Sequence, residues 1–439
     1  MNSATKSTKS FWWLFGLYAV ICVGFAIFRQ YPLRSDSLVY FTWASRAAQM
    51  RTWFPYPETI YDPWLASLFH VNLGALFLRI YNATVTVHLL NAGINLLQLY
   101  LVYRLTLKFF GEQSALTAAW MYVLYLNSLG LVVLNLSELT FTTCTLLSSW
   151  FYFQKPNFKW GFLSGLMAGF ALGCRPLIVA LLLIYGLVWL WNWKFNQRND
   201  YKQLIGIGLG VLLFVLPMGM YSKSQTGQFV YSTTTGPINL LMSGFDGATG
   251  IYNDSILKND SVYLSKKTFY EKGDYIQNRA VKWIVGHPAK WLSFWPLKIK
   301  TTFVNDDIAI SPLLGNPNWN FERFIKDARQ PRAKRQFWQQ PLAYCIAFLT
   351  IHTLQFGYYL LLLGVWGYQL VFYWRQRPTA PLIVWVVNGF TFLGFMMTYV
   401  GSQGNLRYKY PYLVISFIII APVITFLKNV IAQRKTLSP

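Results

Sequence analysis

Residues 204–221 read LIGIGLGVLLFVLPMGMY, eighteen consecutive residues without a charge. An apolar run of about 18 residues or more is long enough to cross the hydrocarbon core of a bilayer as a helix. The rest of the chain has a similar composition. Of its 439 residues, 54% are hydrophobic and only 12% are charged, whereas a soluble domain carries about 25% charged residues. The sequence therefore predicts an integral membrane protein.

Nine further charge-free runs raise the number of predicted membrane-spanning helices to ten. Short basic links between them, such as those around Arg104, Lys155 and Arg375, alternate with links that are not basic. Cytoplasmic links are enriched in lysine and arginine, so this alternation places both termini in the cytoplasm. The predicted fold is an all-α polytopic membrane protein, whose other spans are Phe11–Phe28, Val85–Tyr103, Ser114–Ser137, Leu139–Phe153, Trp160–Cys174, Leu177–Trp193, Leu342–Trp374, Thr379–Val400 and Tyr410–Leu427.

Two segments lie on the non-cytoplasmic side of this topology. The first outer loop, residues 29–84, contains an apolar stripe at helical spacing in Pro63–Ile80, which His70 interrupts among other polar residues. This pattern favours a helix lying at the membrane interface over an additional span. The second is a long polar loop with short helices. The chain thus divides into an N-terminal membrane module (1–221), an extracytoplasmic loop (222–341) and C-terminal spans eight to ten (342–439).

The strong positive charge points to lipid as a partner and not to nucleic acid. The formal net charge is +23, but the aromatic residues lie within runs of membrane length. Anionic lipid is therefore the expected partner of the basic residues. The four cysteines also lie inside apolar runs, which is typical of small core residues and not of a disulfide framework or a metal site: Cys22, Cys144, Cys174 and Cys345.

The acidic residues are few, and their placement is informative. Of 15 acids, nine fall in the long loop, two lie in cytoplasmic links, and four lie elsewhere at the outer face: Asp36, Glu58, Asp62 and Glu138. Asp36 follows the first span and Glu138 opens the fourth, and ionisable residues near the membrane are functional candidates. Two simpler interpretations remain. Ser137 and Glu138 also resemble a helix start with a serine cap, and Asp36 also fits a solvated loop acid.

Two repeated patterns are more typical of packing than of chemistry. A polar face on the second span indicates hydrogen bonding between helices, and it consists of His88, Asn91, Asn95 and Gln98. Glycine recurs every fourth residue on the fifth span, from Gly161 to Gly173, which predicts close contact with another helix.

Arg175, Arg407 and Lys409 lie at outer helix ends, where cations are usually interfacial anchors. Their convergence on a phosphate is the alternative.

Several short motifs, in this order, resemble the GT-C superfamily of integral-membrane glycosyltransferases, in particular glycosyltransferase family 39. This group comprises protein O-mannosyltransferases and lipid A aminoarabinose transferases. An acid and a tyrosine follow the first span, as Asp36 and Tyr40 do here, and a glutamate opens a later outer helix, as in SELTF at Glu138. An Arg-Pro turn follows a later span, as at Arg175. The remaining similar stretches are GPINLLMSGFDGATGIYN (236–253), AVKWIVGHPAKWLSFWPLKIK (280–300) and RYKYPYLV (407–414).

This resemblance implies transfer of a sugar from a polyprenyl-phosphate donor to a glycan, lipid or protein acceptor outside the cytoplasm, with inversion at the anomeric carbon. A hydroxyl acceptor needs a base in the transition state, and the leaving phosphate needs cations. The resemblance implies that Asp36 is the base and that Glu138 is a second catalytic residue. It further implies substrate binding by Tyr40, Asp62, Arg175, His287, Lys298, Arg407 and Tyr408.

The sequence departs from the family pattern at two points. Ser37 stands where the family has a second acid, so two adjacent carboxylates are not available for a metal ion. If a divalent metal ion takes part, Asp36 and Glu138 are its expected ligands, and no other cofactor is expected. The ten spans are also followed by no large soluble domain in this sequence, so substrate recognition is expected to use the two outer loops.

Two other classes of protein remain open. A polymerase or ligase of lipid-linked glycans also combines many spans with one large outer loop. A transporter or lipid flippase would predict inverted repeats and ionisable residues at the bilayer midplane, which the sequence does not suggest. The expected location is a bacterial inner membrane, with the site facing the periplasm. Four Asn-x-Ser/Thr triplets keep an endoplasmic reticulum membrane open: those at Asn82, Asn135, Asn253 and Asn259.

Overall fold

The fold was analysed in a computed structural model, which is all-α throughout the part of the chain that it describes. That part comprises residues 2–29, 31–195, 200–242, 244–248, 250–253, 255–304, 307–316, 319, 321–331, 334–377, 379–402 and 404–437. Within it, seven helices are long and apolar enough to cross a membrane. The protein is therefore a polytopic α-helical membrane protein. These seven helices are α1 (Asn2–Phe28), α4 (Thr84–Leu124), α8 (Val179–Phe195), α9 (Tyr201–Thr226), α18 (Leu342–Arg375), α19 (Leu382–Gly401) and α20 (Tyr410–Leu437).

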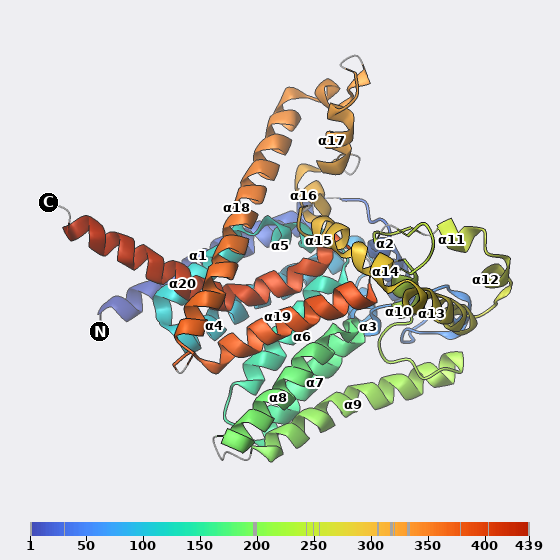
Figure 1. Cartoon of the computed structure of the whole chain (residues 1–439), viewed down its shortest axis with the longest axis horizontal. Helices are drawn as coiled ribbons and strands as arrows, with labels where there is room; N and C mark the ends of the chain where they lie inside the picture. The colour runs from blue at the N-terminus through green and yellow to red at the C-terminus, as the bar shows by residue number, and fades with distance from the viewer. Residues whose placement is uncertain are drawn as a thin grey trace.

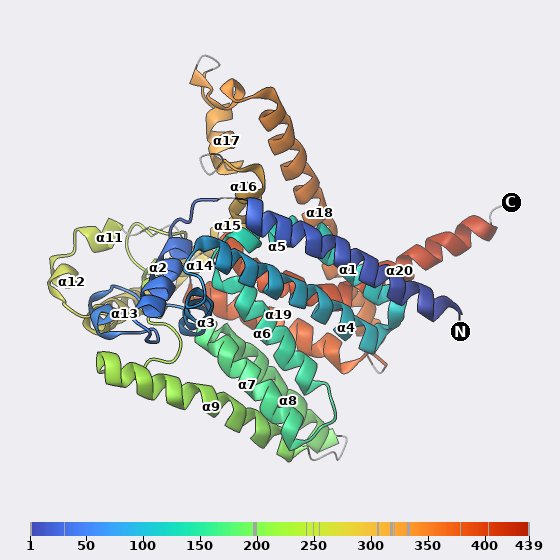
Figure 2. The same ribbon diagram turned by 180° about the vertical axis from the view of Figure 1, so that it is seen from behind.

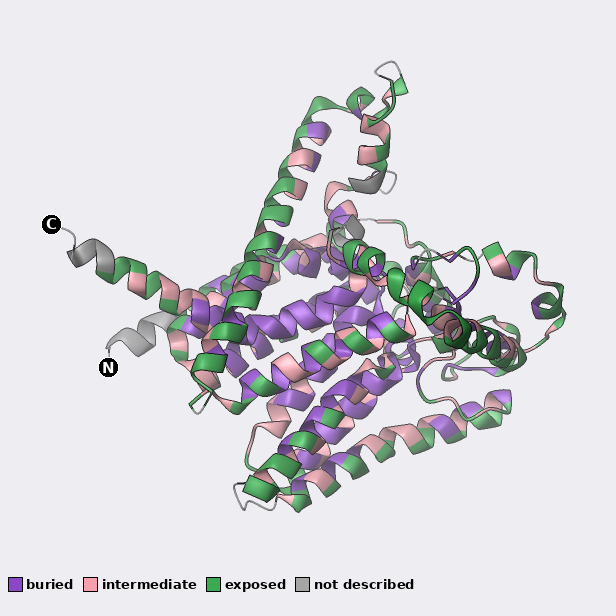
Figure 3. Ribbon diagram, in the orientation of Figure 1, coloured by how far each residue is buried: buried purple, intermediate pink, exposed green. Residues whose placement is uncertain are grey.

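The helices form one bundle with most of the outer-loop helices at one end, whereas α17 (Phe321–Ala328) lies apart from them beside α18 (Figures 1 and 2). The two chain termini lie at the opposite end of the bundle (Figure 1). Figure 3 shows that α6 (Ser137–Tyr152) is almost entirely buried, whereas α18 is exposed along most of its length. The run preceding Arg375 is a single helix of 34 residues, or about 51 Å. It is one long span, as the sequence predicts, and not two short ones.

The predicted third span, Ser114–Ser137, is not a continuous helix. The helix α4 carries residues of both the second and third predicted spans, with a break at Gly111, where φ is +79°. It ends at Leu124, and the chain continues through the short helices α5 (Leu126–Gly130) and η2 (Leu131–Val133) before α6 begins. Hydropathy alone could not show this break, because the irregular segment is as apolar and as buried as a helix.

The polar face of the second span explains how the irregular segment is tolerated. Irregular backbone at membrane depth needs protein partners for its carbonyl groups. Asn91 Nδ2 donates to the carbonyls of Val132 (3.2 Å) and Leu134 (3.0 Å), and Gln98 Nε2 donates to the carbonyl of Leu139 (2.7 Å). The prediction that these amides bond between helices is confirmed.

The glycine repeat on α7 (Phe158–Cys174) packs against α9. A Cβ atom on Gly161 would lie 2.2 Å from the carbonyl oxygen of Gln203, and one on Gly165 would lie 2.0 Å from that of Ile207. Gly206 and Gly210 of α9 face α7 in the same way. The two backbones therefore touch, as the sequence predicts, and this contact fixes the position of the outer end of α7.

The first outer loop forms α2 (Asp36–Gln49), η1 (Pro57–Tyr61) and α3 (Leu68–Leu78). With 11 residues, α3 is about 17 Å long and too short to span a bilayer. The helix is confirmed. Leu65 and Leu68 of the predicted apolar stripe pack in a cluster with α2, whereas Leu76 and Ile80 are exposed, and a position at the membrane interface stays a prediction. The described helices of the long loop are α10 (Gly236–Leu241), α11 (Ser255–Lys258), α12 (Ser261–Ser265), α13 (Phe269–Gly286), α14 (Pro288–Ser293), α15 (Trp295–Val304), α16 (Asp307–Leu314), α17 (Phe321–Ala328) and η5 (Phe337–Gln339).

Candidate functional site

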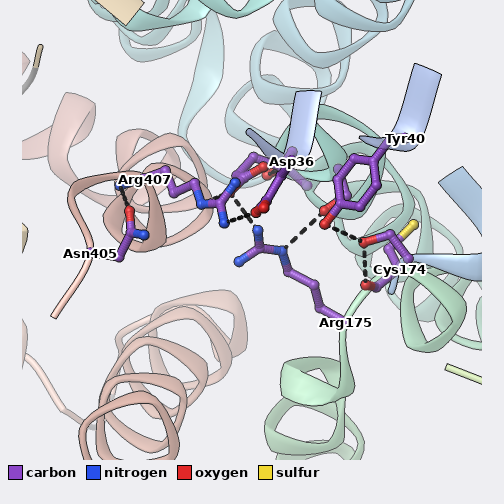
Figure 4. A network of polar contacts seen from close by, with 10 residues as sticks. Asp36, Tyr40, Cys174, Arg175, Asn405 and Arg407 are labelled. Carbon is purple, nitrogen blue, oxygen red and sulfur yellow. Dashed lines mark hydrogen bonds and ion pairs between the residues drawn. The ribbon is translucent and has the colours of Figure 1, made fainter. Parts of the chain in front are cut away.

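Four segments that are distant in sequence meet where the outer loops join the bundle. Asp36 is the first residue of α2, Glu138 lies in the first turn of α6, and Arg175 follows the last residue of α7. Arg407 belongs to η6 (Leu406–Lys409), which leads directly into α20. Figure 4 shows the side chains of Asp36, Arg175 and Arg407 directed towards one another from three different parts of the fold.

Ion pairs join these four side chains into one cluster. Arg407 Nη2 pairs with Asp36 Oδ2, and Arg175 Nη2 pairs with Glu138 Oε1. Arg407 Nε also lies 3.2 Å from Glu138 Oε1, at ion-pair distance but without the angle of a hydrogen bond. Arg407 therefore contacts both acids, and two carboxylates and two guanidinium groups balance their charge. We call these four residues the ion-pair cluster.

Local structure orients each acid of the ion-pair cluster. Ser35, just before α2, has a positive φ of +48°, which is unusual for a residue other than glycine and turns the chain sharply at Asp36. Glu138 lies near the N-terminus of α6, where the helix dipole favours negative charge. The predicted serine cap is wrong, because Leu136 is the N-cap residue of α6. Instead, Ser137 Oγ accepts a hydrogen bond from Arg175 Nε at 3.4 Å.

Burial distinguishes the two carboxylates. The side chain of Glu138 is fully buried, whereas that of Asp36 is 39% exposed. Burial alone would raise the pKa of Asp36, but the neighbouring Arg407 and the more distant Arg175 oppose it and hold this pKa below its ordinary value. Asp36 is therefore an ionised and reachable carboxylate at neutral pH, and Glu138 is an enclosed one.

Two tyrosines flank the ion-pair cluster. The guanidinium carbon of Arg175 lies 5.2 Å from the ring centre of Tyr408, a cation–π distance. Tyr40 lies one turn after Asp36 on α2 and is buried. Burial and the charge of Asp36 raise the pKa of Tyr40 to about 12, so its hydroxyl stays protonated.

Three of the predicted substrate-binding residues have their contacts elsewhere. Asp62 accepts a hydrogen bond from Trp43 Nε1 at 3.1 Å. His287 is exposed and stacks on Trp283 at the end of α13. Lys298 is fully buried and donates to the carbonyl oxygen of Tyr399 at 2.7 Å, and burial lowers its pKa to about 8. Their roles in substrate binding stay predictions.

Sequence reasoning missed a group of buried polar residues behind the ion-pair cluster. His70 bonds to Thr140 and Asn135, and Ser37 Oγ accepts a hydrogen bond from the backbone N–H of Asn135 at 2.8 Å. The sequence contained one indication of this buried group, because His70 is an ionisable residue within an apolar stripe. Asn135 is only 3% exposed, so its Asn-x-Ser triplet does not offer a glycosylation site in this fold.

The residues present do not fit a resident divalent metal ion. Asp36 and Glu138 each already pair with an arginine, and Ser37 stands in place of a second acid. A divalent cation would have to displace or face two guanidinium groups. Among the described residues, no three histidine, cysteine or acidic side chains come together as a ligand set.

Comparison with known proteins gives a likeness in fold but none in sequence. No protein-family model matches the sequence, and no curated protein matches it. Among solved structures, the chain is similar to the oligosaccharyltransferase of Archaeoglobus fulgidus, crystallised in complex with Zn and sulfate. The TM-score is 0.51 at 13% sequence identity, and the match covers 96% of this chain and 50% of that enzyme. The chain thus spans half the length of this enzyme and shares its fold.

Proposed function

We propose that this protein is a glycosyltransferase that moves a sugar from a polyprenyl-phosphate donor to an acceptor at the non-cytoplasmic face of its membrane. The acceptor is a glycan, a lipid or a protein, and the membrane is a bacterial inner membrane with the site facing the periplasm. The shared GT-C fold and the ion-pair cluster support this proposal. The acids and cations come from the outer loops and helix ends, where a lipid-linked substrate presents its headgroup.

One observation carries the assignment of the base. Asp36 is reachable and ionised, whereas Glu138 is enclosed and holds both arginines through a single oxygen. A general base must come within hydrogen-bond reach of the proton that it removes. We therefore assign Asp36 as the base and Glu138 as the residue that holds Arg175 and Arg407 in place.

The proposed reaction is a single displacement. The acceptor oxygen attacks the anomeric carbon as Asp36 takes the hydroxyl proton, and the bond between that carbon and the phosphate oxygen breaks. The electron pair of this bond leaves with the polyprenyl phosphate. Attack from the face opposite the leaving group inverts the anomeric configuration.

The arginines are proposed to bind the carrier phosphate. Arg407 and Arg175 engage the carboxylates through Nη2, and Arg407 Nε faces Glu138, so part of each planar guanidinium group remains for a phosphate. Such cations stabilise the charge that develops on the leaving group. Lys298, a buried lysine on α15 of the long loop, is proposed as a third cation for the carrier phosphate. Tyr408 supports Arg175 by the ring contact described above.

The test is transfer by purified protein in liposomes, with radiolabelled polyprenyl-phosphate sugars and candidate acceptors. Asp36→Asn keeps the shape of the side chain and removes the proton acceptor. Because general-base catalysis contributes about 10²- to 10⁴-fold, we expect turnover to fall by that factor with donor binding retained. Glu138→Gln should instead weaken donor binding, because Arg175 loses its charged partner and Arg407 keeps only Asp36.

The same assay separates the competing functions. A near-normal rate for Asp36→Asn together with an inactive Glu138→Gln would show that the base is Glu138. Processive chain growth would favour a polymerase of lipid-linked glycans, and donor movement across the membrane without transfer would favour a flippase. Either of the last two results would overturn the proposal.

A further inference from the structure

The N-terminal turn of α3 contacts every segment that carries a residue of the ion-pair cluster, except η6. Ser67 Oγ donates to the carbonyl oxygen of Cys174 at 3.2 Å, and it lies 3.4 Å from the hydroxyl of Tyr40. One turn later, His70 lies between Asn135 and Thr140, with both ring nitrogens 2.9 Å from their partners. The turn thus touches α2, the segment before α6, α6 itself and the end of α7.

Each of these contacts lies close in the chain to a residue of the ion-pair cluster. Cys174 immediately precedes Arg175, and Thr140 lies two residues after Glu138. Asn135 donates its backbone N–H to Ser37, the neighbour of Asp36. A small movement of the α3 turn would therefore move both carboxylates and Arg175 relative to one another.

The contacts are enclosed, so water does not compete for them. Ser67, His70, Asn135, Thr140 and Ser37 are each 3% exposed or less. Ser67 also has a positive φ of +54°, one of only three such values among the described residues other than glycine. Such a backbone conformation is strained and persists only where the surrounding structure maintains it. A surrounding structure that maintains this strain also holds the turn in a single position.

The hydrogen bonds fix the tautomer of His70. The amide oxygen of Asn135 can only accept, so Nε2 of His70 carries the proton and donates. Nδ1 then accepts the hydroxyl proton of Thr140. Burial lowers the pKa of His70 to about 4, so the ring is neutral at physiological pH and keeps one donor and one acceptor.

We propose that Ser67 and His70 are positioning residues for sugar transfer, and that the α3 turn sets the relative placement of Asp36, Glu138 and Arg175. They do not touch the substrate in this proposal, which rests on the proposed function. The bond from His70 to Asn135 acts on the Asp36 side, through Ser37. The bond from Thr140 to His70 acts on the Glu138 side, and so on the arginines.

The two bonds can be broken separately. In His70→Gln, the amide nitrogen can replace Nε2 and keep the bond to Asn135, but the acceptor for Thr140 is lost. In His70→Asn, the amide oxygen can replace Nδ1 and keep the bond to Thr140, but the donor to Asn135 is lost. Because a misplacement of about 1 Å can cost about 10²-fold, we expect His70→Asn to lower kcat and His70→Gln chiefly to raise the KM for donor, each by about 10- to 100-fold.

A matched control separates positioning from general stability. Thr145 lies on the same helix as Thr140 and is also buried, but its hydroxyl donates only to the Phe141 carbonyl of its own helix. Thr140→Val should reproduce the KM effect of His70→Gln. The double variant should be no worse than either single variant, because both substitutions remove the same hydrogen bond, between Thr140 and His70. Thr145→Val should leave both constants unchanged. Equal kinetic losses in Thr140→Val and Thr145→Val would overturn the proposal.

A measurement without turnover keeps this inference distinct from the proposed function. Hydrogen exchange of the purified protein should increase in residues 134–140 and 35–40 for His70→Asn, and should be unchanged there for Thr145→Val. If the wild-type protein transfers no sugar but exchange changes in this way, the proposed function fails and the coupling through α3 stands. Unchanged exchange in both segments would refute the coupling itself.

Discussion

Arg407 is the residue on which the ion-pair cluster depends most. It contacts Asp36 and Glu138, although 371 positions separate it from Asp36 in the chain. The backbone N–H of Arg407 donates to the side chain of Asn405 at 3.2 Å, which fixes the start of the short helix η6. The orientation of Arg407 therefore decides both the ionisation of the proposed base and the geometry of the phosphate site.

The replacement Arg407→Ala should change the pH dependence of transfer. In the wild type, burial raises the pKa of Asp36, but Arg407, together with Arg175 and Ser35, holds this pKa below its ordinary value, so the base stays ionised as the pH falls. Without Arg407, burial dominates and this pKa rises. We expect the acid limb of the kcat/KM profile to move to higher pH. Profiles of wild-type and variant protein, measured with the same donor, test this.

Donor binding should fall in Arg407→Ala as well, and Arg407→Lys should restore the pH profile better than the affinity. Lysine supplies the positive charge beside Asp36 but cannot grip a phosphate with two parallel hydrogen bonds. An acid limb that stays in place in Arg407→Ala would show that Arg407 does not control Asp36. Unchanged donor affinity would remove Arg407 from the phosphate site.

At the scale of elements, the contact between α7 and α9 positions Arg175. The last residue of α7 directly precedes Arg175, so the height and rotation of α7 set where this cation lies. Gly161, Gly165 and Gly169 on α7 and two glycines on α9 let the two backbones approach closely, whereas Gly173 faces the ring of Phe214. Small residues at such interfaces allow close approach of helices in membranes.

The replacement Gly165→Ala should separate these helices. The new Cβ would lie 2.0 Å from the Ile207 carbonyl oxygen, a backbone atom that cannot move without its helix. Overpacking of this kind costs typically about 1–3 kcal/mol, so we expect a lower melting temperature in detergent and reduced transfer. Gly186→Ala on α8 is the control, because a Cβ there meets nothing within 4 Å. It should be neutral or stabilising, since alanine exceeds glycine in helix propensity by about 1 kcal/mol. Equal melting temperatures would contradict the packing argument.

The irregular segment between α4 and α6 places Glu138 at a helix start. A continuous span through residues 114–137 would leave no break there and would move the first turn of α6. The amides of α4 bond to carbonyls of this segment and of the first turn of α6, so they support the broken path from inside the bundle. Without these amides, each buried carbonyl group would lack a hydrogen-bond donor, which costs about 1–3 kcal/mol of folding free energy per group.

At the scale of the whole molecule, the arrangement of helices agrees with an asymmetric orientation in the membrane. Most helices of the two outer loops lie at one end of the bundle, with α17 beside α18, and the termini lie at the opposite end (Figure 1). The basic links predict that the termini face the cytoplasm. The ion-pair cluster would then lie on the non-cytoplasmic side.

Cysteine accessibility in sealed, right-side-out vesicles tests this orientation. The native cysteines are all buried and should give little background. Lys258→Cys in the long loop and Lys155→Cys in a basic link are both exposed positions. A membrane-impermeant maleimide should label the first from outside and the second only after the vesicles are opened. The reverse pattern would invert the topology and place the proposed site in the cytoplasm.

The sequence by itself determined the features that depend on local composition and spacing. Apolar runs identify membrane helices because lipid offers no partners for polar groups. The glycine repeat identifies a contact face because its period is that of a helix. The spacing of Asp36 and Tyr40 puts both side chains on one face only if a helix begins at Asp36, and α2 begins there. The fold class and most of the long helices could therefore be predicted from the linear sequence alone.

Only the tertiary structure decided which charged residues meet. Asp36, Glu138, Arg175 and Arg407 lie at four separate helix ends, and no local pattern states which ends converge. It also decided that Glu138 is enclosed while Asp36 is reachable, because burial depends on neighbours from α2, α7 and η6. The role of His70 became visible only when α3 was placed between these elements. Pairing and burial are properties of the packed bundle, and a linear sequence specifies them only through the complete fold.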